Sequence, residues 1–210
     1  MAQQARAVKT RREIIKAAAE VFERRGYAAA TMAEIIAAAG VTKGAVYFHF
    51  ASKEELAQAV IDVQSDWFDL DADPAPGFQA VIDATMIYAS ALINDVIVRA
   101  TNRLVIEHGT FDMPNTEPYL ADILTIRDLV VRAEEAGDML PRLDPFAVAQ
   151  TITGAFTGIQ LSSQVLSRRT DLFDRLVNMW RVMLPGLVQP ERLLTLDPTG
   201  SPHLRPTADA

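Results

Sequence analysis

The sequence predicts an all-α protein in which a three-helix head precedes a larger helical body, with about nine or ten helices in total. Apolar residues recur at helical spacing in nearly every segment of the 210-residue chain. Ser or Thr stands three residues before Glu at Thr10, Thr31 and Ser52, a pattern typical of capped helix starts. Residues 1–53 hold nine Lys and Arg against four Glu, a net charge of +5, whereas the whole chain carries −7. A basic head therefore precedes a remainder of net charge −12.

Composition excludes several classes of protein. Half of the residues are hydrophobic, and no apolar run approaches the 18 residues that a membrane-spanning helix needs. The first residues, MAQQARAVKTRR, have no apolar stretch behind their charges, so we expect no signal peptide and a cytoplasmic protein without a membrane partner. The absence of cysteine removes disulfides, thiolate nucleophiles and Cys-type zinc sites. We expect neither a metal nor a cofactor.

The head contains a helix-turn-helix pattern. Gly26 and Gly40 are natural left-handed stops for the first two helices, and Thr42 is the expected N-cap of the third. Ser52 opens a fourth helix, so the third must be short. In a helix-turn-helix the second helix of the pair lies in the major groove of DNA. The three predicted helices of the head are residues 10–25, 32–39 and 43–50.

Four adjacent rings follow Lys43 and Gly44 in the stretch VTKGAVYFHF, residues 41–50. Adjacent residues point to different sides of a helix, so these rings divide between two tasks. A buried aromatic cluster that closes a small bundle accounts for part of the run, but it explains neither the lysine nor the glycine. We expect Val46 and Phe50 to pack inward. The remaining side chains that can reach phosphates or base edges are Lys43, Tyr47 and His49, with Gly44 and Ala45 allowing close approach.

The rest of the chain predicts a connecting helix, a helical body and a tail. The fourth helix runs over about 53–68 and is followed by the acidic, proline-bearing loop DLDADPAPG. Long helices are then expected over 78–94, 96–108, 118–136, 145–167 and 171–187. The predicted organisation is a DNA-binding domain over 1–52, a ligand-binding and dimerisation domain over 53–194, and a disordered tail over 195–210 that contains three prolines.

The segment EIIAAAGVTKGAVYFHFASKEELA, residues 34–57, resembles the DNA-binding domain of the TetR family of regulators. More narrowly, residues 42–64 and the stretch GAFTGIQLSSQ, residues 154–164, resemble the γ-butyrolactone autoregulator receptors of antibiotic-producing bacteria. The resemblance implies a TetR-like homodimer in which each head enters one major groove and the last two long helices form a four-helix bundle. It also implies a repressor of antibiotic or secondary-metabolite genes that binds a palindromic or pseudopalindromic operator in double-stranded DNA.

The resemblance assigns DNA contacts to the head. It implies direct contacts from Lys43, Tyr47, His49 and Lys53, with Thr42 and Gly44 contributing a hydroxyl or a backbone N–H. A basic N-terminal arm would grip phosphate, and the backbone N–H of Thr31 would meet phosphate at the positive end of a helix dipole. The predicted DNA-binding set is Arg6, Lys9, Arg11, Thr31, Thr42, Lys43, Gly44, Ala45, Tyr47, His49 and Lys53.

Residues 145–187 support dimerisation independently of the resemblance. The two helices predicted there carry more large apolar residues than one small body can bury, and Gly154 and Gly158 permit close helix packing. The alternative is that these residues pack within a monomer. A single helix-turn-helix offers few contacts, which favours pairing across two half-sites.

By the same resemblance, the body binds a small inducer: a γ-butyrolactone, a butenolide or a furan. Helices that mix apolar and isolated polar residues supply the predicted ligand-binding set, which is Gln64, Trp67, Met86, Tyr88, Leu104, Tyr119, Asp122, Ile126, Phe156, Thr157 and Gln160. One departure matters, because Asp122 takes the place of a tryptophan that the receptors use. A buried carboxylate needs a partner, and Arg103 and Arg127 are the expected ones. A pseudo-receptor that answers to an antibiotic or a biosynthetic intermediate is the alternative.

Two other classes of function remain as alternatives. An enzyme is disfavoured, because the three histidines do not pair at metal-ligand spacing and the chain has neither G-x-S-x-G nor a phosphate-cradling glycine loop. We therefore expect no catalytic activity. A ligand-independent architectural DNA-binding protein would not need a separate acidic body.

Overall fold

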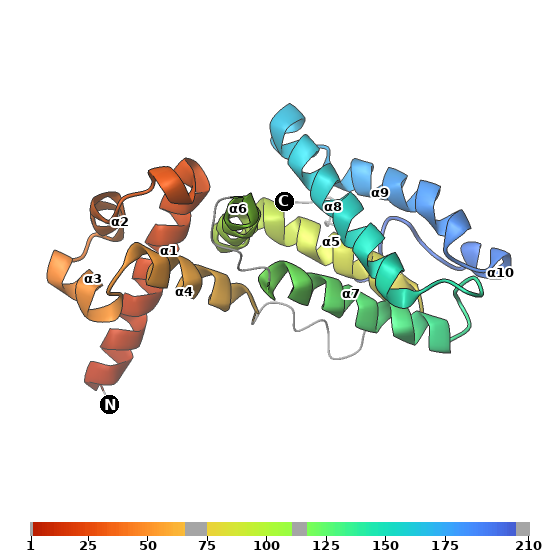
Figure 1. The fold of residues 1–210 in the computed structure, drawn as a ribbon, viewed down its shortest axis with the longest axis horizontal. Coiled ribbons are helices and arrows are strands. Elements are labelled where there is room, and N and C mark those ends of the chain that lie inside the picture. The colour runs from red at the N-terminus through yellow and green to blue at the C-terminus, as the bar shows by residue number, and fades with distance from the viewer. Residues whose placement is uncertain (1, 66–74, 111–116, 205–210) are drawn as a thin grey trace. The chain divides into compact units, whose positions relative to one another are not determined.

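A computed structural model describes residues 2–65, 75–110 and 117–204. In these residues the fold is all-α, as predicted, with one isolated antiparallel bridge between Met139 and Val188 (Figure 1). The long helices are α1 Ala2–Ala29, α4 Lys53–Ser65, α5 Gln79–Asn94, α6 Val96–Thr110, α7 Glu117–Glu135, α8 Pro145–Ser167 and α9 Leu172–Met183. The short ones are α2 Met32–Ala39, α3 Lys43–His49, η1 Leu184–Gly186, α10 Pro190–Leu193 and η2 Pro202–Leu204.

The chain divides into two compact units. Unit 1 comprises Met1–Asp69 and Asn94–Pro118, and unit 2 comprises Leu70–Ile93 and Tyr119–Ala210. Unit 1 thus combines α1–α4 with α6, so it is larger than the head predicted over residues 1–52. Unit 2 contains α5 and all the helices from α7 onward.

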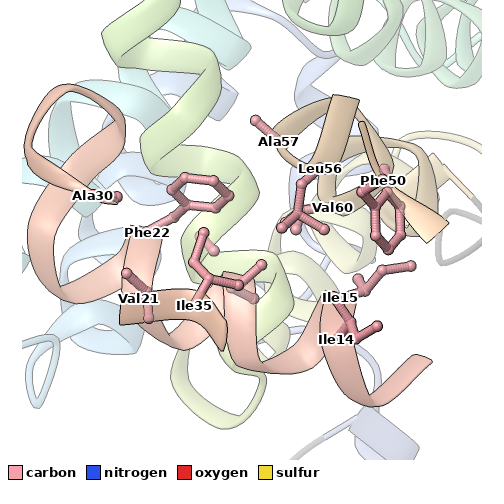
Figure 2. Packing of buried hydrophobic residues seen from close by; sticks show 14 of the residues in the cluster. Ile14, Ile15, Val21, Phe22, Ala30, Ile35, Phe50, Leu56, Ala57 and Val60 are labelled. Atoms are coloured by element: carbon pink, nitrogen blue, oxygen red, sulfur yellow. The ribbon is translucent and has the colours of Figure 1, made fainter. Parts of the chain in front are cut away.

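A single apolar cluster holds unit 1 together. Figure 2 shows Phe22 and Ile14 of α1 facing Ile35 of α2 and Leu56 of α4, and all four are fully buried. Phe50, which follows α3, closes the cluster with an exposed fraction of 1%. Burial of each such side chain contributes about 1.5–3 kcal/mol, so this cluster fixes where α3 stands on the unit.

The capping patterns give three different outcomes. The Thr31 side chain accepts a hydrogen bond from the Glu34 N–H at 3.2 Å while Glu34 accepts one from the Thr31 N–H at 3.1 Å, which confirms that capping box. At Ser52 only half forms, because Glu55 accepts from the Ala51 N–H instead. The helix start predicted at Thr10 is wrong: α1 begins at Ala2, since every residue of AQQARAVK except Val8 continues a helix readily.

The helices of the body start within one residue of the predicted positions, from α5 at Gln79 to α9 at Leu172. In unit 2 they pack around Trp180, which is fully buried. Its indole N–H donates to the Thr85 hydroxyl at 2.9 Å, and its ring meets Phe78 edge-to-face at 6.0 Å between centroids. α9 ends earlier than predicted, and residues 184–186 form the 3-10 turn η1 at Pro185.

The predicted disorder of the tail is wrong for residues 195–204. Asp83 is buried on α5, and its carboxylate accepts hydrogen bonds from the Ser201 N–H at 2.8 Å and hydroxyl at 2.5 Å. Gln79 also bonds Asp197, accepting from its N–H at 2.8 Å. These hydrogen bonds hold residues 195–204 against α5, although the segment has few apolar residues that could do so. Residues 205–210 lie outside the described residues.

Within the described ranges, no single helix is long and apolar enough to span a membrane. α5 and α6 reach the necessary length and apolar composition only when they are taken together, as a bent pair. No group of three or more His, Cys, Asp or Glu in the same ranges could hold a metal ion.

Candidate functional site

The third helix of unit 1 is short and held at both ends. Gly40 adopts the left-handed conformation, with φ +63°, and makes the turn that leads into α3. The Thr42 hydroxyl caps the helix by accepting from the Ala45 N–H at 3.2 Å. Val46 and Phe50 are 0% and 1% exposed, as predicted, so α3 is anchored to the core along one side. Its other side is free to meet a partner.

Several predicted contact residues share that outer side. The Lys43 ammonium lies 5.8 Å from the centroid of the Tyr47 ring, which is 44% exposed. His49 is partly exposed, and no atom lies within 4 Å of the position where Gly44 would carry a Cβ. A cation, a phenol hydroxyl and an imidazole therefore stand beside bare backbone, a combination that suits phosphate and base-edge contacts.

Phe48 belongs to the same surface, although the predicted set omits it. Its side chain is 80% exposed and contacts the His49 ring edge-on at 5.1 Å. The sequence did contain a signal for the exposure of Phe48. Val46 and Phe50 point inward and are four residues apart, so the residue midway between them points away from the core. An exposed aromatic ring on this surface can contact a thymine methyl group.

The predicted phosphate contacts of α1 lie in a helix rather than in an extended arm. Arg6, Lys9 and Arg11 are exposed on α1. The Arg11 guanidinium lies 5.1 Å from the centroid of the Phe50 ring, which places this cation at the end of α3. Lys9 stands 3.9 Å from Glu13, an exposed pair that leaves the cation available.

Two of the predicted DNA contacts already have partners within unit 1. The Thr31 N–H donates to Glu34, and the hydrogen bonds from the Thr31 hydroxyl and N–H lower the pKa of that carboxyl, so phosphate must displace a carboxylate there. The Lys53 ammonium donates to the carbonyl oxygens of Tyr27 at 2.8 Å and Ala30 at 3.0 Å. Lys53 also lies 4.4 Å from the centroid of the Tyr27 ring.

A group of the predicted ligand-binding residues converges in unit 2. The hydroxyls of Tyr119 on α7 and Thr157 on α8 lie 3.3 Å apart, and the Tyr88 ring of α5 lies 5.4 Å from that of Phe156. Three more members of the predicted ligand-binding set are buried on the same three helices: Met86, Ile126 and Gln160. Gln160 accepts a hydrogen bond from Arg169 at 3.3 Å, so its oxygen is engaged within the unit.

Asp122 does not pair with Arg127, one of the two arginines expected for it, because Arg127 pairs with Asp128 at 2.7 Å. Arg103 belongs to unit 1, where it pairs with Glu107 at 2.6 Å, and its pairing with Asp122 stays a prediction. Burial raises the pKa of Asp122 to about 7. A partly buried carboxyl whose pKa lies near neutrality is a candidate functional group.

The remaining predicted ligand residues lie elsewhere. Leu104 is fully buried in the core of unit 1, next to α1 and α4. Gln64 is part of α4, and its side chain, like the whole of Trp67, lies outside the described residues.

Thr153 is a polar residue of unit 2 that the predicted set omits. It is 9% exposed, and its hydroxyl is buried with no hydrogen-bond partner in the described part of the chain. Its spacing of four residues from Thr157 places both on one face of α8, which was the available signal.

Comparison with known proteins agrees with this architecture. Residues 14–60 match the family described as bacterial regulatory proteins, tetR family, and residues 76–189 match the tetracyclin repressor-like C-terminal domain. The A-factor receptor protein of Streptomyces griseus is 40% identical over 95% of this chain and 71% of its own. The crystal structure of full-length native TylP from Streptomyces fradiae gives a TM-score of 0.80 at 41% identity, covering 92% of this chain and 93% of that one.

A third relative was solved with DNA. CprB from Streptomyces coelicolor, in complex with its biological operator sequence, gives a TM-score of 0.77 at 33% identity, over 90% of this chain and 94% of that one. The matches cover both the helix-turn-helix and the helical body. The chain therefore belongs to the TetR family of bacterial transcription regulators.

Proposed function

We propose that this regulator is a repressor that binds a palindromic or pseudopalindromic operator as a homodimer and leaves it when a small molecule binds unit 2. The observation that carries the proposal is the outer side of α3, where Lys43, Tyr47 and Phe48 are exposed on a helix whose other side is fixed in the core. The operator complex of CprB supports a role in DNA binding.

Dimerisation is proposed through α8 and α9. Most of the large apolar residues from which dimerisation was expected pack inside a single chain. The buried ones in unit 2 are Ile152, Phe156, Leu172, Leu176, Met179 and Trp180. A different face of α8 is open: Gly154, Gly158, Leu161 and Val165 are all exposed and follow one another at spacings of four, three and four. That spacing puts them on one side of the helix, where a second copy can pack closely.

The releasing ligand is proposed to be a γ-butyrolactone, a butenolide or a furan-type signal, and the controlled genes to be those for antibiotics or other secondary metabolites. The relative named as the A-factor receptor supports a receptor role. Asp122 favours the second candidate, a pseudo-receptor that answers to an antibiotic or a biosynthetic intermediate, because an uncharged lactone does not compensate a partly buried carboxylate.

A gel shift on the DNA upstream of the chain's own gene tests the repressor. Lys43→Ala is expected to weaken binding and to reduce the slope of log affinity against log salt by about one, since one phosphate contact is lost. Lys16→Ala is the matched control, because Lys16 is an exposed lysine of α1 outside the predicted DNA-binding set.

Extracts from cultures of antibiotic-producing bacteria should then release the wild-type chain from its DNA. Footprinting distinguishes the remaining class of function: indiscriminate protection of DNA, with no effect of any extract, would identify an architectural DNA-binding protein instead of a ligand-responsive repressor.

A further inference from the structure

Two polar groups in unit 2 have no partner in the part of the chain that the structure describes. The Thr153 hydroxyl of α8 is buried without a hydrogen bond among the described residues. A buried unpaired hydroxyl costs about 1–3 kcal/mol, and most such groups in native proteins are satisfied. Asp122 of α7 is partly buried, and Arg127, an arginine of the same helix, is paired with Asp128.

These two groups flank an observed contact between their helices. The Thr157 hydroxyl donates to the Thr153 carbonyl at 2.8 Å and lies 3.3 Å from the Tyr119 hydroxyl. Tyr119 precedes Asp122 by three residues on α7, and side chains at that spacing are neighbours on a helix surface. These contacts join Tyr119, Thr157 and Thr153, and helix spacing places Asp122 on the same face of α7 as Tyr119. We call the four residues the α7–α8 cluster.

The chemistry of the α7–α8 cluster indicates which groups a ligand bound there would need. An ionised carboxylate only accepts hydrogen bonds, and in apolar surroundings it needs a positive partner. No ion pair joins Asp122 to a cation within the described ranges, and burial raises the pKa of this carboxyl. A hydroxyl such as that of Thr153 can either donate or accept.

We propose that the small molecule bound by unit 2 carries a protonated amine, with Asp122 as its counter-ion and Thr153 as a hydrogen-bond partner for a neighbouring polar group. This inference rests on the proposed function, in which unit 2 binds the releasing ligand. It narrows the ligand from neutral lactones to amine-bearing molecules.

Calorimetry on the full chain at pH 8 tests the pairing with two probes of equal length. One is a γ-butyrolactone with a 6-aminohexyl chain at carbon 2, and the other carries a heptyl chain there. The wild type is expected to bind the amine about tenfold more tightly, which is the effect of about 1.4 kcal/mol from one ion pair. Asp122→Asn should abolish the preference, because Asn keeps the volume and removes the charge.

Two further variants make the test specific. Asp174→Asn is the matched control: it is the same change at an exposed aspartate of unit 2, on α9, and it should keep the preference. Thr153→Val keeps the shape but removes the hydroxyl, and it should weaken binding of both lactones. Asp122→Ala replaces Asp122→Asn in the comparison if the latter does not fold.

The proposal is overturned if the wild type prefers the heptyl lactone, binds the two equally or binds neither, or if Asp122→Asn retains the preference. Gel shifts keep this result separate from the proposed function. An amine that binds through Asp122 without releasing DNA contradicts the repressor mechanism, whereas loss of DNA binding in a chain that still prefers the amine contradicts only the DNA-binding role.

Discussion

The Lys53 ammonium lies at the C-terminal end of α1, where it donates hydrogen bonds to the carbonyls of Tyr27 and Ala30. The last carbonyls of a helix carry partial negative charge, and hydrogen bonds to a charged group stabilise by about 1.5–3 kcal/mol. We predict that Lys53→Ala lowers the free energy of unfolding by about 1–3 kcal/mol in urea titrations. Lys16→Ala, which removes an exposed lysine from α1, should change it by less than about 0.5 kcal/mol.

DNA titrations of the same two variants separate the roles of Lys53. Two of its three N–H donors are engaged by the carbonyls, and the third can still meet phosphate. A salt slope that falls by about one would support the phosphate contact that the resemblance implies. An unchanged slope with lowered stability would leave Lys53 as a structural residue.

Side chains with local partners could be predicted from the sequence, and those with distant partners could not. The Thr31 box was predictable because both of its groups lie within three residues. The partners of Lys53 lie 23 and 26 residues away, so no local pattern indicates them. Thr10 and Glu13 show the converse failure: a capping pattern inside a longer helix is indistinguishable from two polar residues one turn apart.

At the scale of elements, the junction between α1 and α6 is a feature of unit 1 that the sequence did not predict. Glu107 of α6 accepts from the Tyr27 N–H at 2.7 Å and pairs with Arg103, which donates to the Glu23 carbonyl at 2.7 Å. This contact is possible because Gly26, with φ +75° and ψ 170°, breaks α1 and lacks a side chain. An added Cβ there would lie 2.6 Å from the Glu107 carboxylate.

We predict that Gly26→Ala destabilises the chain by about 1–3 kcal/mol, because it combines a strained backbone with displacement of Glu107. Gly40→Ala is the matched control, since Gly40 also has positive φ, +63°, but no atom within 4 Å of an added Cβ. It should cost about 1 kcal/mol from backbone strain alone. Equal losses in urea titrations at one protein concentration would show that the Glu107 contact contributes nothing.

Body helices, by contrast, were predictable because their ends carry strong local signals. α8 begins and ends at the predicted residues, with Asp144 accepting hydrogen bonds from the Phe146 and Ala147 N–H groups before Pro145 continues the helix. What the sequence could not give was the use of each helix face. Apolar residues of α8 and α9 that looked available for a partner are buried in unit 2, because helices far apart in sequence cover them.

At the scale of the whole molecule, the central question is whether the open stripe of α8, which consists of Gly154, Gly158, Leu161 and Val165, joins two chains. Val165 and Leu161 are 74% and 47% exposed on that stripe, and Val182 of α9 is 80% exposed. An exposed apolar surface of this kind marks an interaction site, and paired heads are needed to read two half-sites. We predict that Leu161→Glu combined with Val165→Glu gives a species with the 23.0 kDa mass of one chain in light scattering, whereas the wild type has twice that mass.

The same double variant should lose DNA binding by at least about a hundredfold while it keeps its helical content, because both residues lie outside the core of unit 2. Leu194→Glu is the control: Leu194 is 93% exposed but lies beyond α8 and α9, so its variant should stay dimeric and bind DNA normally. A double variant that keeps both the mass and the affinity of the wild type would place the dimer interface on another surface. A monomeric variant with unchanged affinity would show that one head suffices, which a single helix of seven residues on one half-site makes physically implausible.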